Sequence, residues 1–276
     1  MEHRSPGAGV GLAPDGTILR EGSLARVQPE FAAVVEAART RIGAAWGGRL
    51  HSAYVYGSVP RGTARVGRSD LDLLVVLREA PAPADREAAG GLEAALDRDF
   101  PVVDGVGVLL FDAATLLSEL ERHDLGFFVA CLCTPLLGPD LAARLPRYRP
   151  DTLLARETNG DLALALPGWQ ARRASARTDA ELRALCRVAA RRVVRTGFTL
   201  VMPRWGGWTS SLDAQAEAFA GYYPERGAAM RRAAGWASAP TADPAALAAL
   251  LDDLGPWLVP VYRAAHGPKA PRPPAA

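Results

Sequence analysis

The stretch from residue 53 to residue 77 constrains the fold more than any other part of the chain. An apolar run stops at Gly57-Ser58, eleven residues rich in glycine and arginine follow, and then a second apolar run begins. Asp70 and Asp72 open that second run, and both carboxylates point the same way because side chains two apart in a strand share a face. The rest of the run has no polar side, which predicts a strand covered on both faces with two acids at its entrance.

The residue types around the two acids favour a metal-phosphate site. Neighbouring carboxylates repel and lose hydration near an apolar core, so the pKa of one would rise unless a cation lay between them. Carboxylate oxygens of this kind suit Mg²⁺. Gly57 allows close approach of the backbone to a ligand, and Ser58 offers a hydroxyl and an N–H to a phosphate. Arg61, Arg65 and Arg68 would neutralise a polyphosphate.

This order of residues resembles the signature of the nucleotidyltransferase superfamily, which has the polymerase-beta-like fold. The resemblance rests on Gly57-Ser58, Arg61-Gly62 and Ser69-Asp70-Leu71-Asp72-Leu73, covers roughly residues 30–146, and is strongest to minimal and aminoglycoside-type nucleotidyltransferases. The loop between Ser58 and Asp70 is about one residue longer in this chain than is expected in those nucleotidyltransferases. The resemblance implies an α+β fold, in which an N-terminal nucleotidyltransferase domain with a mixed sheet flanked by helices precedes a C-terminal α-helical bundle.

The third strand is predicted over Val102 to Phe111 and contains one acid, Asp104. A charge there is costly unless it is paired or bound to a metal. In the resembling families a third carboxylate on the neighbouring strand completes the site, and Asp104 is where it would fall. The alternatives are that Asp104 faces water or that another acid takes this place; the rivals at element ends are Asp97, Asp99 and Asp112.

The resemblance also implies the chemistry and its ligands. Asp70, Asp72 and Asp104 would be catalytic and bind two Mg²⁺, with Asp104 also accepting the proton of the attacking hydroxyl. Nucleotide binding would fall to Gly57, Ser58, Arg61 and Ser69. The expected reaction transfers an NMP from an NTP, ATP by preference, onto a hydroxyl of a small acceptor such as an aminoglycoside or another antibiotic, and releases pyrophosphate.

Three alternatives to this function remain open. The acceptor is a protein or a tRNA end, as in toxin–antitoxin pairs; or the fold has lost turnover and acts as a binding module; or the second half serves only dimerisation. The presence of all three acids argues against the binding module. A net charge of +2 over 276 residues argues against a nucleic-acid partner.

Composition narrows the chemistry further. Lys269 is the single lysine, so a Walker A loop, a kinase lysine and a Schiff base are excluded. Three cysteines without a secretion signal favour a reducing compartment and buried thiols. We expect a soluble cytoplasmic protein, a monomer or homodimer, with no membrane partner.

The remaining pattern predicts four regions: an arm over 1–28, the catalytic domain over 29–146, a helical domain over 147–266, and a disordered Pro-rich tail over 267–276. Asp15-Gly16 favours a small hairpin in the arm. The predicted helices cover 29–45, 86–98, 113–124, 151–166, 179–197, 212–236 with a break near Tyr222-Tyr223-Pro224, and 243–265. Residues 127–137 fit a helix or a strand equally.

Some residues of the second half have two interpretations. Trp205, Trp208, Tyr222 and Tyr223 either pack in the core, which we favour, or form a wall for a base or sugar ring. Glu157 and Asp161 either lie at the surface or contact a cationic acceptor. The helix over 179–197 has an arginine face, which is usually exposed to solvent; the alternative is that it faces the active site.

Overall fold

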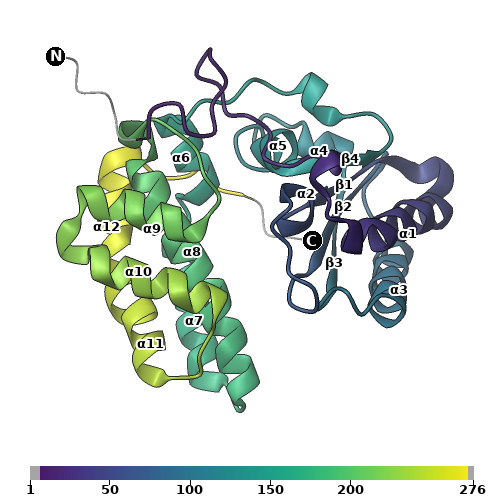
Figure 1. The fold of residues 1–276 in the computed structure, drawn as a ribbon. Helices are drawn as coiled ribbons and strands as arrows, with labels where there is room; N and C mark the ends of the chain where they lie inside the picture. The colour runs from purple at the N-terminus through teal and green to yellow at the C-terminus, as the bar shows by residue number, and fades with distance from the viewer. Residues whose placement is uncertain (1–6, 273–276) are drawn as a thin grey trace. The chain divides into compact units, whose positions relative to one another are not determined.

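The computed structural model describes residues 7–272 and divides the chain into two compact units (Figure 1). The sheet unit is Leu19–Arg147, and the helical unit consists of residues 7–18 together with the chain from Tyr148 onward. A mixed sheet with helices is thus followed by a helical region, which confirms the predicted α+β fold class.

The sheet contains four strands in the order β3-β2-β1-β4. Their bounds are β1 Leu50–Tyr56, β2 Leu71–Leu77, β3 Val106–Asp112 and β4 Cys133–Leu137. β1 is antiparallel to β2 and to β4, whereas β2 and β3 are parallel. The inner position of β2 explains its continuous apolar sequence, because a strand covered on both faces needs apolar side chains on each.

The helices of the sheet unit begin with α1, which buries Phe31, Val34, Val35, Ala38, Ile42 and Trp46. Their bounds are α1 Pro29–Trp46, α2 Ser58–Arg61, α3 Pro83–Asp99, α4 Ala113–Leu116 and α5 Leu125–Phe127. Short 3₁₀ turns cover Leu24–Arg26, Gly47–Arg49 and Leu141–Arg144, and a π-helical segment covers Phe128–Leu132. Residues 127–137, predicted as helix or strand, therefore form both in succession.

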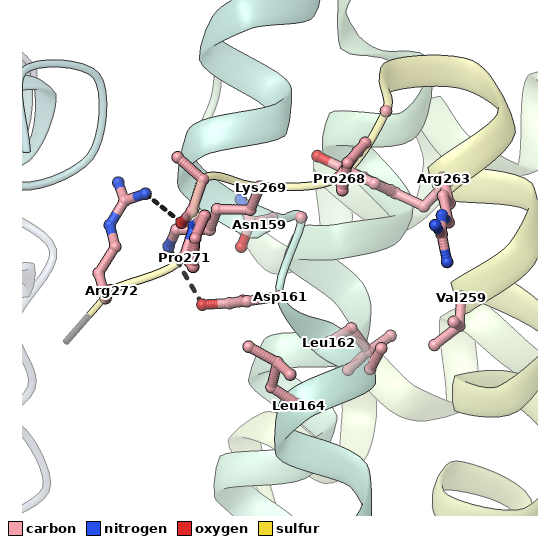
Figure 2. A pocket seen from close by; sticks show the side chains of 15 residues that line it. Asn159, Asp161, Leu162, Leu164, Val259, Arg263, Pro268, Lys269, Pro271 and Arg272 are labelled. Carbon is pink, nitrogen blue, oxygen red and sulfur yellow. Dashed lines mark hydrogen bonds and ion pairs between the residues drawn. The ribbon is translucent and has the colours of Figure 1, made fainter. Parts of the chain in front are cut away.

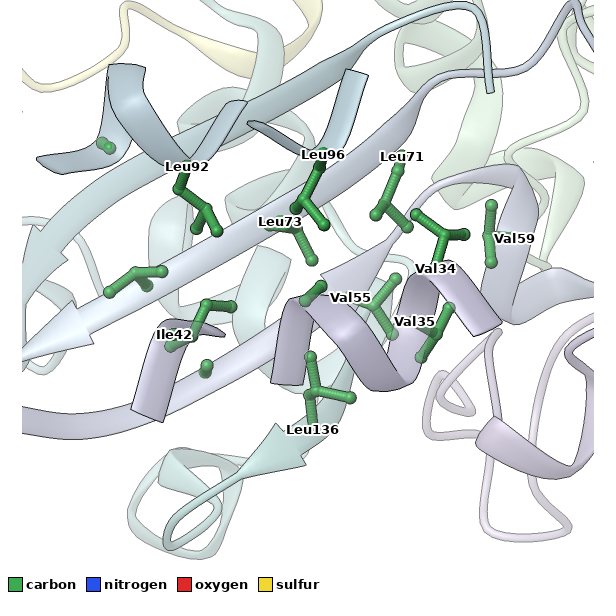
Figure 3. Close-up of a cluster of buried hydrophobic side chains, with 14 of the residues drawn as sticks. Val34, Val35, Ile42, Val55, Val59, Leu71, Leu73, Leu92, Leu96 and Leu136 are labelled. Carbon is green, nitrogen blue, oxygen red and sulfur yellow. The ribbon is translucent and has the colours of Figure 1, made fainter. Parts of the chain in front are cut away.

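Two apolar clusters cover the two faces of the sheet. On one face, side chains of α1 and α3 such as Val34, Ile42 and Leu96 meet Leu71 and Leu73 of β2 (Figure 3). The opposite face carries a smaller cluster around Tyr54, Leu74, Val76, Val129 and Cys133. Alternation along β2 thus sends Asp72 to the same face as Leu74, where the apolar covering is thinner.

The helical unit is organised around the long helix α8. Its helices are α6 Thr152–Asn159, α7 Leu162–Ser175, α8 Asp179–Trp205, α9 Leu212–Tyr222, α10 Pro224–Ser238, α11 Pro244–Ala248 and α12 Gly255–His266, with a π-helical segment over Ala249–Leu254. α8 begins with a capping box, because the Glu181 N–H donates to Thr178 Oγ1 at 3.2 Å and the Thr178 N–H donates to Glu181 Oε2 at 3.0 Å. The predicted break before Pro224 separates α9 from α10.

The prediction that Gly197 ends this helix is wrong. α8 continues to Trp205 and ends at Gly206, which has a φ of 78°. A Cβ on Gly197 would lie 2.3 Å from Cε of Met230 in α10, so the glycine is there to let α10 pack close. Residues 198–205, predicted as a connection, are therefore helical.

Three other element boundaries differ from the prediction. The helix expected over 151–166 is two helices separated at Gly160-Asp161, and the one expected over 113–124 covers only α4. The third strand starts at Val106 instead of Val102, because the preceding residues form a turn in which the Val103 N–H donates to the Phe100 carbonyl.

Of the four aromatic side chains singled out in the helical unit, Trp208 is buried, while Trp205, Tyr222 and Tyr223 are half-buried and Arg204 lies over the Tyr222 ring. Trp205 and Trp208 both meet the ring of Phe198 edge-on, and Trp208 is buried. Tyr223 stacks on Phe219 at a centroid distance of 5.2 Å. These rings thus hold α8, α9 and the following chain together.

The predicted arm is split between the two units at Ile18 and Leu19. The Asp15-Gly16 turn forms, with a β-bridge between Leu12 and Ile18. The arm is tied to the helical unit by hydrogen bonds from the Gly7 N–H to the Trp205 carbonyl and from the Trp208 N–H to the Val10 carbonyl, both 2.9 Å. Residues 1–6 of the arm lie outside the described residues.

The first six residues of the predicted disordered tail lie against α6 and α7. Lys269 Nζ is 3.1 Å from Asp161 Oδ2, and an Arg272 amine is 3.0 Å from Oε2 of the buried Glu157. Burial raises the pKa of Glu157, but hydrogen bonds from Arg156 and Arg272 outweigh this and hold it below its ordinary value. Residues 273–276 lie outside the described part of the chain.

One stretch among residues 7–272, Pro244–His266, is long and apolar enough to cross a membrane by length and composition alone. Its side chains include Leu250, Leu254 and Leu258, which are buried in the helical unit. Core helices satisfy the same criterion, so this is weak support for a membrane span.

Candidate functional site

Asp70 and Asp72 lie at the start of β2, directly beside the turn that follows β1. Asp72 is in register with Tyr56 of β1 and with Gly107 of β3. Gly57, which ends β1, has a φ of 82°, and a Cβ there would lie 2.4 Å from Asp72 Oδ2. Only glycine allows the chain both this conformation and this approach to a carboxylate. Two half-buried carboxylates on one face beside a glycine turn fit a hard cation such as Mg²⁺.

The register of β2 and β3 places glycines, not acids, beside this pair. A Cβ on Gly105 would lie 3.6 Å from Asp70 Oδ1, and one on Gly107 would lie 4.0 Å from Asp72 Oδ1. Asp104 is exposed in the bend before β3, where its N–H donates to the Ser69 carbonyl at 3.1 Å. Within residues 7–272, no three His, Cys, Asp or Glu side chains gather in a group that could hold a metal ion. The role of Asp104 as third ligand therefore stays a prediction.

The loop between the two halves of the motif is held by its own hydrogen bonds. The Thr63 N–H donates to the Ser58 carbonyl at 3.0 Å, and Ser69 Oγ accepts the Arg65 N–H at 2.9 Å. Arg61, expected to bind phosphate, lies 3.4 Å from a carboxylate oxygen of Glu21. Ser58 and Arg61 both belong to α2, which starts directly after Gly57. Because Gly57 lies against the Asp72 carboxylate, the short helix that follows it starts beside the acid pair.

Two of the three rival acids, Asp99 and Asp112, have structural roles elsewhere in the sheet unit. Asp99 forms an ion pair with Arg41 at 2.7 Å, and the hydrogen bond from Arg41 lowers the pKa of Asp99. Asp112 caps α4 by accepting the Thr115 N–H at 2.8 Å. Asp97 is exposed on α3.

The thiols of β4 and the segment before it are not poised for nucleophilic chemistry. Cys133 is in register with Tyr56, and burial raises its pKa well above the ordinary value, with Asp140 and Asp72 adding to the rise against Arg20. Burial likewise raises the pKa of Cys131 to about 12. Both therefore stay protonated at neutral pH, as the sequence predicted for buried thiols.

Two residues that contact or neighbour the predicted site residues were not singled out from the sequence. Tyr56 shares the face of Asp72 and meets the ring of Phe128 edge-on at a centroid distance of 4.9 Å. Glu21, which pairs with Arg61, comes from the segment before α1. Tyr56 could have been found from the sequence, because it stands two residues before Ser58 at the end of an apolar strand. The ion pair between Glu21 and Arg61 could not, because it joins residues that only the fold brings together.

A separate pocket of 350 Å³ lies in the helical unit, between the start of α7, the end of α12 and the tail (Figure 2). Leu162 and Val259 form part of its apolar wall, while Arg263 lies at its side. None of the residues expected to bind metal or nucleotide lines this pocket.

Residues 36–111 match the family model described as the nucleotidyltransferase domain. The matched segment runs from within α1 to β3 and includes the turn at Gly57-Ser58 and the acids Asp70, Asp72 and Asp104. This confirms, for this part of the chain, the superfamily predicted from the sequence. Such a domain indicates a transferase that moves nucleoside monophosphates. A search of the curated proteins finds no match.

Proposed function

We propose that the sheet unit transfers an NMP, with ATP as the donor, onto an acceptor hydroxyl and releases pyrophosphate. The observation that carries this proposal is the pair Asp70 and Asp72 on one face of β2, with Gly57 turned against the Asp72 carboxylate, inside the matched nucleotidyltransferase segment. Asp70 and Asp72 would hold Mg²⁺, which when bound stabilises charge on the transferring phosphate. Ser58 and the Gly57 backbone would hold the outer phosphates of the donor.

The proposed acceptor is a small hydroxylated molecule, such as an antibiotic. The two acids that were candidates for contacting a cationic acceptor are already paired: Glu157 with Arg156 and Arg272, Asp161 with Arg192 and Lys269. This pairing supports a neutral acceptor more than a polycation such as an aminoglycoside. The excess of basic residues in the helical unit supports a second candidate, a nucleic-acid acceptor.

Calorimetric titration with a non-hydrolysable ATP analogue tests the proposal. We expect binding that requires Mg²⁺ in the wild-type protein and that Asp72→Asn abolishes, because the variant removes one of two carboxylate charges. Asp97→Asn is the matched control, since it removes an exposed carboxylate from α3 and should leave binding unchanged. If the wild type binds none of the ATP, GTP, CTP and UTP analogues, the transferase proposal is wrong and a binding module becomes the better interpretation.

A further inference from the structure

The small net charge of the chain conceals an uneven distribution between its two units. Residues 148–276 carry 17 Lys and Arg against 11 Asp and Glu, whereas residues 19–147 carry 14 against 17. The helical segment is therefore net basic and the sheet unit net acidic. The low whole-chain charge, which argued against a nucleic-acid partner, does not describe the surface of the helical unit.

The excess of positive charge is concentrated at the end of α7 and along α8. Residues 172–195 contain eight arginines and only two acids, Asp179 and Glu181. Both acids are engaged at the start of α8, because Asp179 pairs with Arg183 at 3.1 Å and Glu181 accepts the Arg177 and Thr178 N–H groups. Further along α8, Arg192 pairs with Asp161 at the start of α7.

Three of these arginines form a row on α8. Arg187, Arg191 and Arg195 are four residues apart, so they share one face of the helix with a spacing of about 6 Å along its axis. Arg191 and Arg195 are exposed and Arg187 is partly exposed, while the other face of the helix buries Leu185, Cys186, Ala189 and Val193. The α8 arginine row is therefore a rigid line of cations at the surface of the helical unit.

We propose that the α8 arginine row binds the phosphate backbone of a nucleic acid. Guanidinium groups pair with phosphate oxygens through parallel hydrogen bonds, and evenly spaced cations match a polymer of phosphates better than one small anion. Residues 172–195 contain no aromatic side chain for stacking on bases, so the binding is to the backbone and independent of sequence. An anionic membrane fits less well, because the apolar face of α8 is buried and Val188 is the exposed large apolar side chain beside the row.

This inference deepens the proposed function and rests on it in one respect: a nucleic acid is the second candidate for the acceptor of the NMP. The binding itself belongs to the helical unit and needs no transfer activity. Asp72→Asn should therefore bind nucleic acid as the wild type does, so a failure of the row and a failure of the transferase site give different results.

Fluorescence anisotropy on the full chain tests the row, with an RNA hairpin and a DNA duplex of equal length as separate probes. If the row makes three phosphate contacts, a plot of the logarithm of the affinity against the logarithm of the salt concentration should have a slope of about −2 to −3. The variant Arg187→Gln with Arg191→Gln should weaken binding about 30-fold near 0.1 M salt and reduce the steepness of the slope by about 1.5. Preference for the RNA or the DNA probe identifies which nucleic acid is bound.

The matched control is Arg86→Gln with Arg232→Gln, which removes the same charge from exposed positions on α3 and α10. We expect its affinity to stay within about twofold of the wild type, since neither position lies on the row. The proposal is overturned if the wild type binds neither probe, if both double variants weaken binding equally, or if polyglutamate displaces the probes at equal charge concentration, which would indicate an acidic protein partner instead.

Discussion

Gly57 illustrates how a single residue fixes the geometry of the candidate site. Its positive φ turns the chain at the end of β1, and the absence of a side chain leaves the space that the Asp72 carboxylate occupies. The residue therefore has two separate reasons to be glycine. Each of them is local to the pair of strands that carries the acids.

We predict that Gly57→Ala lowers the free energy of unfolding by about 1–3 kcal/mol, the cost of a strained backbone, and weakens Mg²⁺-dependent nucleotide binding. The added Cβ must displace the Asp72 carboxylate, so binding should fall even where the protein stays folded. Urea unfolding and calorimetry of the same preparation measure the two effects. Gly67→Ala is a matched control, because Gly67 also has a positive φ of 65° but has no atom within 4 Å of an added Cβ. Nucleotide binding unchanged in Gly57→Ala would contradict the proposed position of the site.

At the scale of the element, the glycine in the middle of α8 is explained by packing against other helices and not by helix propensity. Gly197 lies in the middle of a helix of 27 residues, where glycine is unfavourable by about 1 kcal/mol relative to alanine. Met230 of α10 and Phe219 of α9 occupy the space that a side chain would take. Helix packing therefore outweighs helix propensity at this position.

The comparison of two glycine-to-alanine variants tests this account. Gly197→Ala should destabilise the protein by about 1–3 kcal/mol through overpacking. Gly90→Ala in α3, where nothing lies within 4 Å of an added Cβ, should stabilise it by up to about 1 kcal/mol through helix propensity. Thermal unfolding of both variants measures the two signs, and a stabilising Gly197→Ala would refute the packing explanation.

The elements that could be predicted from the sequence are those whose causes are local. The apolar spacing of α1, the capping box of Thr178 and Glu181, and the acid pair opening β2 all act within a few residues. The start of β3 was missed because a local turn occupies the residues before Val106. The extent of α8 could not be predicted, because the glycine within it packs against distant segments, α9 and α10. The same holds for the glycines beside the acid pair: only the register of β2 and β3 shows that Gly105 and Gly107, and not Asp104, are adjacent to Asp70 and Asp72.

At the scale of the whole molecule, the chain passes between its two units twice, after Ile18 and after Arg147. The two passages are joined by a hydrogen bond from the Ile18 N–H to the Tyr148 carbonyl at 2.7 Å. Ile18 is buried, and the arm before it is hydrogen-bonded to the end of α8 and the chain that follows. The helical unit is therefore completed by residues from the start of the sequence.

We predict that deleting residues 1–18 lowers the free energy of unfolding of the helical unit by about 3 kcal/mol, from the lost burial of Ile18 and the lost hydrogen bonds. Tryptophan fluorescence in urea reports this unit, because five of the six tryptophans lie in residues 148–276. Equal midpoints for the deletion variant and the wild type would show that the arm adds nothing to stability.

The split arm also sets an order of events during biosynthesis. Residues 7–18 leave the ribosome roughly 10–40 s before Trp205 and Trp208, their hydrogen-bonding partners, because about 190 residues are translated in between. The sheet unit, Leu19–Arg147, is contiguous and is completely synthesised during this interval. Residues 7–18 are therefore synthesised before the sheet unit, but they can form these hydrogen bonds only after the second half of the helical unit has been made.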